Sequence, residues 1–167
     1  MVKKTLHLQA AKQAGGFVID TALVAVPLYL FFSATKLLHY VAALLSQLFL
    51  SGLGKTATIA YNIVPYLRLP GLEVEISDLC SGGLELALLF GFIYASKDRN
   101  VQHRIKGAIV GLVFFVLFNA ARIAFTVNTF GTAWFEPLHE ALFRAVLIIG
   151  LVSFYAIWYY WPHSRNG

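Results

Sequence analysis

The sequence predicts an all-α integral membrane protein with about four transmembrane helices, the first one long and kinked, and a short external β-hairpin before the cysteine-bearing helix. Its 167 residues are 59% hydrophobic and 13% charged, with a mean hydropathy of +0.71, whereas a soluble domain is about 25% charged. Several apolar runs approach the roughly 20 residues that a crossing needs. These features exclude soluble, disordered and collagen-like proteins. The single cysteine, Cys80, excludes an internal disulfide and a cysteine-based zinc site.

The apolar runs define one membrane domain over 1–167. No Gly-Pro or Asn-Gly turn divides the first run, and its half after Lys36 is too short for a crossing, so we expect one helix kinked near Pro27. A tight helical hairpin between Ser33 and Lys36 is the alternative. The expected segments are a cytoplasmic N-terminus (1–15), the long first helix (17–50), an external strand or hairpin segment (51–78), the second span (79–95), the third span (105–130), the fourth span (137–161) and a cytoplasmic tail (162–167).

Basic residues set the orientation, because cytoplasmic loops carry an excess of Lys and Arg. With a single first crossing, the outer side holds only Lys55 and Arg68. Both termini are therefore expected in the cytoplasm of a prokaryotic cell, in a multi-pass plasma-membrane protein. The basic run 97–106 is expected to contact anionic lipid, and it lacks the aromatic interleaving of a nucleic-acid site. The inner side holds Lys3, Lys4, Lys12, Lys97, Arg99, Arg104, Lys106 and Arg165.

The segment before the second span has a different texture. Residues 57–64 are rich in β-forming residues, Pro70-Gly71 is a turn signal, and residues 72–77 alternate apolar and polar side chains. This pattern predicts a short external strand pair that leads directly into the cysteine-bearing helix.

Cys80 lies where that strand-like segment becomes an apolar helix. Ser81, Gly82 and Gly83 follow it, and the glycines allow a substrate or backbone to approach closely. A thiol beside a helix N-terminus is activated by the helix dipole and by free N–H groups, which also stabilise an oxyanion. The alternative is an inert cysteine that packs beside a loop.

Asn119 and Arg122 lie three residues apart inside the third apolar run, so they share a helix face. An arginine inside a membrane is costly, so by default it is a candidate functional residue; the alternative is that its side chain snorkels to the headgroups. Glu85, near the start of the second span, is a candidate ion-pair partner for Arg122 or Arg144, and lining a cavity is the alternative. Asp20 and His39 are expected to be interface residues.

His139 is expected in the first turn of the fourth span, two residues after Pro137, a residue that suits the first turn of a helix. A histidine can act as a base or as the cationic partner of a thiolate, but an interfacial role is the alternative. The topology brings Cys80, Arg122 and His139 to the same outer leaflet. A thiol, a cation and an imidazole form a set of groups suited to acyl transfer.

These residues resemble the exosortase/archaeosortase family of prokaryotic membrane cysteine transpeptidases. The resemblance rests on Cys80-Ser81-Gly82, on the segment 119–123 (Asn-Ala-Ala-Arg-Ile) and on His139. It implies that Cys80 is the nucleophile, that Arg122 stabilises the thiolate or oxyanion, and that His139 is the general acid/base. Asn119, Ser81 and Gly82 are supporting residues. Some archaeal relatives use arginine in the third place, so Arg144 is a rival to His139.

The resemblance also implies the reaction. A thiol protease of this type cleaves the C-terminal sorting signal of a secreted protein, which consists of a short motif, a hydrophobic helix and a basic tail. It acts at the outer membrane interface through a thioester, and it transfers the protein to a surface or lipid acceptor. The expected partners are these secreted proteins and membrane lipid, with no nucleic acid, cofactor or metal. The alternatives are a non-enzymatic membrane assembly or lipid-binding subunit and, ranked last, a small transporter.

Overall fold

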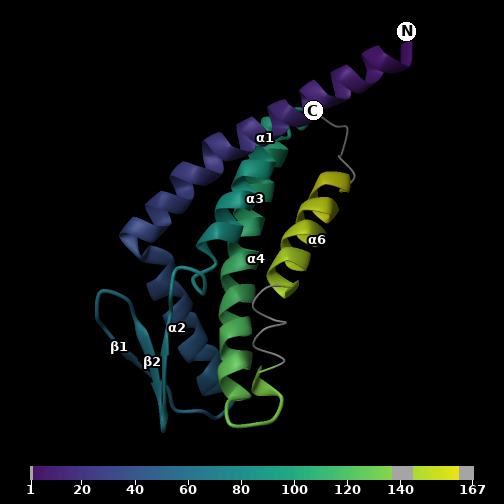
Figure 1. Cartoon of the computed structure of the whole chain (residues 1–167). Coiled ribbons are helices and arrows are strands. Elements are labelled where there is room, and N and C mark those ends of the chain that lie inside the picture. The colour runs from purple at the N-terminus through teal and green to yellow at the C-terminus, as the bar shows by residue number, and fades with distance from the viewer. Residues whose placement is uncertain (1, 137–144, 162–167) are drawn as a thin grey trace.

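The computed structural model describes the backbone of residues 2–136 and 145–161, and the side chains of residues 11–136 and 145–161. Helices dominate the chain, as expected, and a small sheet lies at one end of them (Figure 1). The helices are α1 (Val2–Thr35), α2 (Leu37–Gly52), α3 (Gly83–Ala95), α4 (Val101–Asn128) and α6 (Leu147–Tyr160). The strands are β1 (Thr58–Ala60), β2 (Tyr66–Leu69) and β3 (Leu72–Glu75).

The first apolar run forms two helices, which corrects the expectation of one helix over 17–50 kinked near Pro27. Pro27 lies inside α1, and the break falls at Lys36, which adopts a left-handed conformation with φ 53°. The amide of Lys36 still bonds to Phe32 O, while Lys36 O accepts the amide of His39 as α2 begins. The break is where the hairpin alternative placed it, but α2 turns away from α1 instead of folding back along it (Figure 1).

The segment 51–78 forms three strands instead of one hairpin. β1 pairs with β2 and β2 with β3, both antiparallel, in the order β1-β2-β3. The turn at Pro70-Gly71 joins β2 to β3, as the sequence predicts, and Gly71 has a φ of 77°. Leu67 of β2 and Ile76 are fully buried against α2 and α4. The sheet therefore covers the helices at the end of the molecule where Cys80 lies.

Two apolar clusters hold the helices together. One joins α2, the sheet and the end of α4, and Cys80 packs against it. The other joins α3, α4 and α6. Close helix packing depends on small residues: a Cβ added at Gly91 of α3 would lie 2.7 Å from the backbone oxygen of Thr21 in α1. Gly91 therefore allows these two backbones to touch.

Among the described residues, two helical segments are long and apolar enough to cross a membrane, Ala11–Thr35 and Val101–Asn128. Three shorter apolar helices are Leu37–Gly52, Gly83–Ala95 and Leu147–Tyr160. The second and third spans expected at 79–95 and 105–130 correspond to α3 and α4, with shifted ends. The fourth, expected at 137–161, corresponds to α6 only in part, because 137–144 lie outside the described residues. The number of crossings and their orientation remain predictions.

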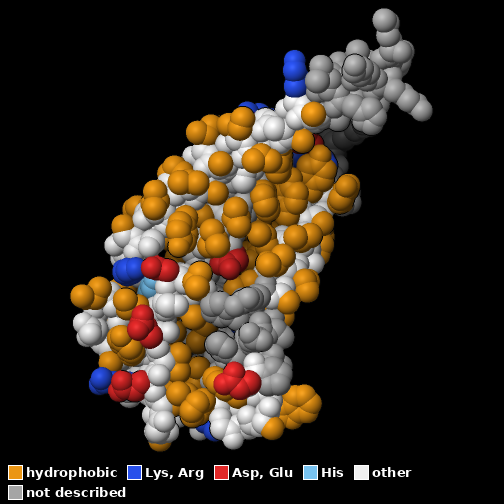
Figure 2. All heavy atoms as spheres, in the orientation of Figure 1, with side chains coloured by type: hydrophobic (Ala, Val, Ile, Leu, Met, Phe, Trp, Pro, Cys, Tyr) orange, Lys and Arg blue, Asp and Glu red, His pale blue; other side chains and the backbone are white. Residues whose placement is uncertain are grey.

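The surface differs between the helical part and the part that carries the sheet. In the face shown in Figure 2, hydrophobic side chains cover the part formed by the long helices, whereas most of the charged side chains gather around the end that carries the sheet. The exposed large hydrophobic residues include Val18, Leu23, Val113 and Ile149, from three different helices. An apolar outer surface around helices is what a lipid environment requires.

Candidate active site

Cys80 lies in a tight turn between β3 and α3. Its amide donates a hydrogen bond to Ser77 O at 2.9 Å, and the amide of Ser81 donates to the same oxygen at 3.0 Å. The hydroxyl of Ser81 donates to Asp78 O at 2.8 Å and accepts from the amide of Gly83 at 3.2 Å. Ser81 therefore stabilises the turn and satisfies the first amide of α3, which is the task of a helix cap.

Gly82 completes this turn and explains why a glycine is needed there. Its φ is 75°, a region that residues with a Cβ adopt at an energetic penalty. A Cβ at this position would also lie 3.1 Å from Cγ and Nδ2 of Asn119. The glycine thus allows the backbone to reverse and α4 to approach the cysteine turn.

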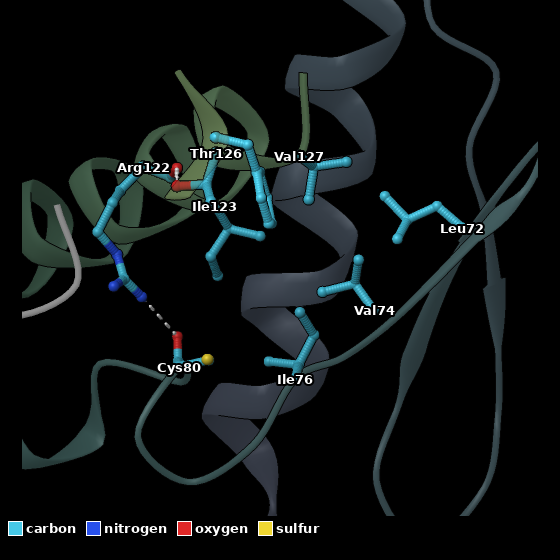
Figure 3. A pocket seen from close by; sticks show the side chains of 9 residues that line it. Leu72, Val74, Ile76, Cys80, Arg122, Ile123, Thr126 and Val127 are labelled. Carbon is cyan, nitrogen blue, oxygen red and sulfur yellow. Dashed lines mark hydrogen bonds between the residues drawn. The ribbon is translucent and has the colours of Figure 1, made fainter. Parts of the chain in front are cut away.

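Two polar side chains of α4 reach Cys80 from across the fold. Asn119 Nδ2 donates to Cys80 O at 2.8 Å, and Arg122 Nη2 donates to the same oxygen at 3.4 Å. Asn119 is 3% exposed and Arg122 is 7% exposed. Both contact the main chain, so they fix the position of the turn. Figure 3 shows the Cys80 carbonyl directed at Arg122 and the sulfur turned to the other side, toward Ile76.

A cavity of about 100 Å³ adjoins the cysteine. Leu72 and Val74 of β3 line one wall, and Ile123 and Val127 of α4 line the opposite wall (Figure 3). Cys80 is itself half-buried. The half-buried thiol thus borders a mainly apolar cavity that also has a guanidinium at its border, and charges interact more strongly in such a setting than in water.

The structure brings together five of the six predicted site residues. Cys80, Ser81 and Gly82 form the turn, and Asn119 and Arg122 hold it from α4, on one helix face as their spacing predicts. The sixth residue, His139, and its rival Arg144 lie outside the described residues. Their places in the site therefore remain predictions.

Glu85 lies in the first turn of α3. Its carboxylate and the Arg122 guanidinium interact electrostatically. The ion pair between Glu85 and Arg122 that the sequence suggests stays a prediction.

A cluster around Asp78, two residues before Cys80, was not predicted from the sequence. Asp78 Oδ1 accepts hydrogen bonds from Ser33 Oγ at 3.0 Å and Lys36 Nζ at 2.9 Å, and it lies 2.9 Å from His39 Nε2. The hydrogen bond from Lys36, helped by the one from Ser33, lowers the pKa of Asp78 below its usual value. The carboxylate ties the cysteine turn to the break between α1 and α2.

This cluster corrects the expectation that His39 is an interface residue, since its side chain is 1% exposed. Burial lowers the pKa of His39, although Asp78 acts in the opposite direction. Asp20, the other expected interface residue, pairs with Lys97 and so joins α1 to the loop after α3. The sequence did offer a signal for the Asp78 cluster: Lys36 and His39 interrupt the first apolar run.

Comparison with known proteins gives one distant relative. No protein-family model matches the chain, and no solved structure matches it. A segment of 78 residues is 27% identical to a protein of Methanocaldococcus jannaschii described as "Probable archaeosortase D". The match covers 47% of this chain and 51% of that protein, so it spans about half the length of the relative. The chain is therefore similar, over part of its length, to an archaeosortase.

Proposed function

We propose that this chain is a membrane-embedded cysteine transpeptidase of the archaeosortase type. It would cleave the C-terminal sorting signal of secreted proteins at the outer membrane interface and transfer them to a surface or lipid acceptor. The observation that carries the proposal is the meeting of the cysteine turn with Asn119 and Arg122, which are 39 and 42 residues away in the chain. The apolar cavity at the thiol and the partial similarity to an archaeosortase support the same reaction.

The chemistry follows from the groups at the turn. The Cys80 thiolate attacks the carbonyl carbon of the scissile peptide bond, and a C–S bond forms as the carbonyl oxygen becomes an oxyanion. The C–N bond then breaks, the leaving amine takes a proton from His139, and a thioester remains on Cys80. An acceptor amine or hydroxyl gives its proton back to His139 and attacks the thioester; the C–S bond breaks, which restores the Cys80 thiolate and the protonated His139.

Arg122 supplies positive charge where negative charge develops. Its guanidinium is buried and lies beside the Cys80 carbonyl, so its positive charge is held at the cysteine turn before the reaction begins. Preorganised charge of this kind is worth about 10²–10³ in rate for a single oxyanion donor. Asn119, with its shorter bond, holds the turn that presents the thiol.

Processing of a secreted protein tests the proposal. The substrate is a protein from the same genome that ends in a short motif, an apolar helix and a basic tail, co-expressed with the full chain. We expect that Cys80→Ala and Arg122→Ala abolish loss of the C-terminal tail while the variants still accumulate in the membrane. Full processing by Cys80→Ala would refute the nucleophile assignment. Thr58→Ala, at the exposed far edge of the sheet, is the control with unchanged processing.

A second candidate is a non-enzymatic membrane assembly or lipid-binding subunit. One observation favours it: Asn119 and Arg122 bond to the backbone of Cys80, and polar side chains that bridge membrane segments also serve assembly alone. This candidate predicts that Cys80→Ser has no effect. Treating intact cells with a membrane-impermeant thiol reagent tests whether Cys80 lies on the outer side. Labelling of Cys80 only after permeabilisation would mean that the proposed orientation is wrong.

A further inference from the structure

The cavity beside Cys80 is built mainly from one strand and one helix, with Phe135 added from the segment after α4. Of the three strands only β3 contributes, through Leu72 and Val74, and Ile76 continues the same alternation toward the cysteine. Residues two apart on a strand share a face. The intervening Glu73 and Glu75 are exposed on the other face of the sheet. One wall of the cavity is thus an apolar row that ends four residues before the nucleophile.

The one hydroxyl on the opposite wall already uses its proton within its own helix. Thr126 Oγ1 donates to Arg122 O at 2.9 Å, one turn back in the same helix. Ile123 and Val127 supply the apolar lining from α4, and Arg122 lies at its border. A polar side chain that entered the apolar part of this space, away from Arg122, would lose water and gain few hydrogen bonds, whereas an apolar side chain would be favoured.

β3 is also an edge strand. It pairs with β2 on one side, and no strand within 2–136 or 145–161 pairs with its other side. An edge strand presents unpaired N–H and C=O groups, to which an extended peptide adds as a further strand, while pockets for alternate side chains give specificity. The edge leads along the chain from Leu72 toward Cys80.

We propose that this cavity is the subsite for one apolar side chain of the acyl-donor peptide next to the scissile bond, with the peptide extended along the edge of β3. The inference rests on the proposed function, because it takes the Cys80 thiol as the attacking group. It adds the selectivity of the site: a branched apolar residue is accepted and its polar isostere is rejected.

The test uses the full chain in lipid nanodiscs and two probes, acetyl-leucine chloromethyl ketone and acetyl-asparagine chloromethyl ketone. Their side chains have the same branching and differ in polarity. The Cys80 sulfur displaces chloride, so a C–S bond forms, the C–Cl bond breaks and the thiol proton passes to buffer. Because the chain has one cysteine, the mass of the intact protein reports the reaction directly. Rates are divided by those of the same probes with glutathione.

We expect the leucine probe to label at least about tenfold faster than the asparagine probe, a ratio that corresponds to roughly 1.4 kcal/mol. Val74→Trp fills the cavity and should remove this preference while labelling by iodoacetamide changes less than about twofold. The matched control is Thr58→Trp, which adds the same indole at the exposed far edge of the sheet and should keep the preference. If the tryptophan variant does not fold, Val74→Ala is the second test. It enlarges the cavity and should shift the preference toward a phenylalanine probe.

Equal rates for the two probes in the unsubstituted protein would overturn the subsite. So would an alkyl chloromethyl ketone without peptide bonds that reacts as fast as the leucine probe, since that result assigns the cavity to a lipid chain. The probes do not require turnover, so the two proposals fail separately. Processing that depends on Cys80 without a probe preference refutes the subsite alone, and a probe preference with processing intact in Cys80→Ala refutes the proposed function.

Discussion

Replacing Gly82 by alanine tests the contact between the cysteine turn and α4. Two penalties are expected. The left-handed conformation, with φ 75°, costs a residue with a Cβ about 1–2 kcal/mol. The new Cβ would also lie 3.1 Å from the carboxamide of Asn119. That carboxamide must shift, and its 2.8 Å bond to Cys80 O would lengthen or break. Leaving a buried acceptor unsatisfied costs about 1–3 kcal/mol, so the total is roughly 2–5 kcal/mol.

Gly71→Ala is the matched control. Gly71 has nearly the same φ, 77°, and a Cβ there meets nothing within 4 Å. This variant should show the conformational penalty alone, about 1–2 kcal/mol. The assay is the free energy of unfolding by SDS titration in lipid–detergent micelles, and the double variant Gly82→Ala/Asn119→Ala should lose less than the sum of its parts. Equal losses for Gly82→Ala and Gly71→Ala, with additive double variants, would refute the contact.

Three further predictions concern stability. The pKa of Asp78 is lowered in the folded state. Its contribution to stability is therefore complete above about pH 4, the pKa of an unfolded aspartate, and is lost as the pH falls through the lower folded value. In Asp78→Asn, the melting temperature should fall less steeply over this acidic range than in the unsubstituted protein. The pKa of His39 is also lowered, so the unfolded chain takes up protons first and stability should fall as the pH drops below about 6.5; an unchanged profile in His39→Asn would contradict this. Gly91→Ala should weaken the packing of α1 on α3 by about 1–3 kcal/mol, because its Cβ meets Thr21 O at 2.7 Å, whereas Gly15→Ala, which has open space, should not destabilise in the same SDS titration.

Local sequence patterns predicted the parts of the fold that depend on local physics. Apolar runs marked the helices, Pro70-Gly71 marked the turn between β2 and β3, and the alternation over 72–77 predicted β3. The spacing of Asn119 and Arg122 placed both on the face of α4 that meets Cys80. Each of these predictions needs only a few neighbouring residues.

The break at Lys36 could not be predicted in the same way. Lysine is not a residue that favours a positive φ, and its partner Asp78 is 42 residues away. Pro27, the local signal for a kink, leaves α1 continuous. The strand β1 is only three residues long and depends on pairing with β2. Whether Asn119 and Arg122 meet the sulfur or the carbonyl of Cys80 is likewise set by tertiary packing.

The position of Cys80 at the junction of the sheet and the apolar helices has a consequence for traffic through the site. The cysteine turn joins an edge strand that carries two exposed glutamates to a helix of mainly hydrocarbon side chains. In the proposed reaction, the severed hydrophobic tail can therefore depart sideways among the lipid chains, while the nucleophilic group of a surface or lipid acceptor reaches the thioester from the side of the sheet. Departure and arrival use different routes, so the acceptor need not wait for the tail to clear its own path before the thioester is resolved.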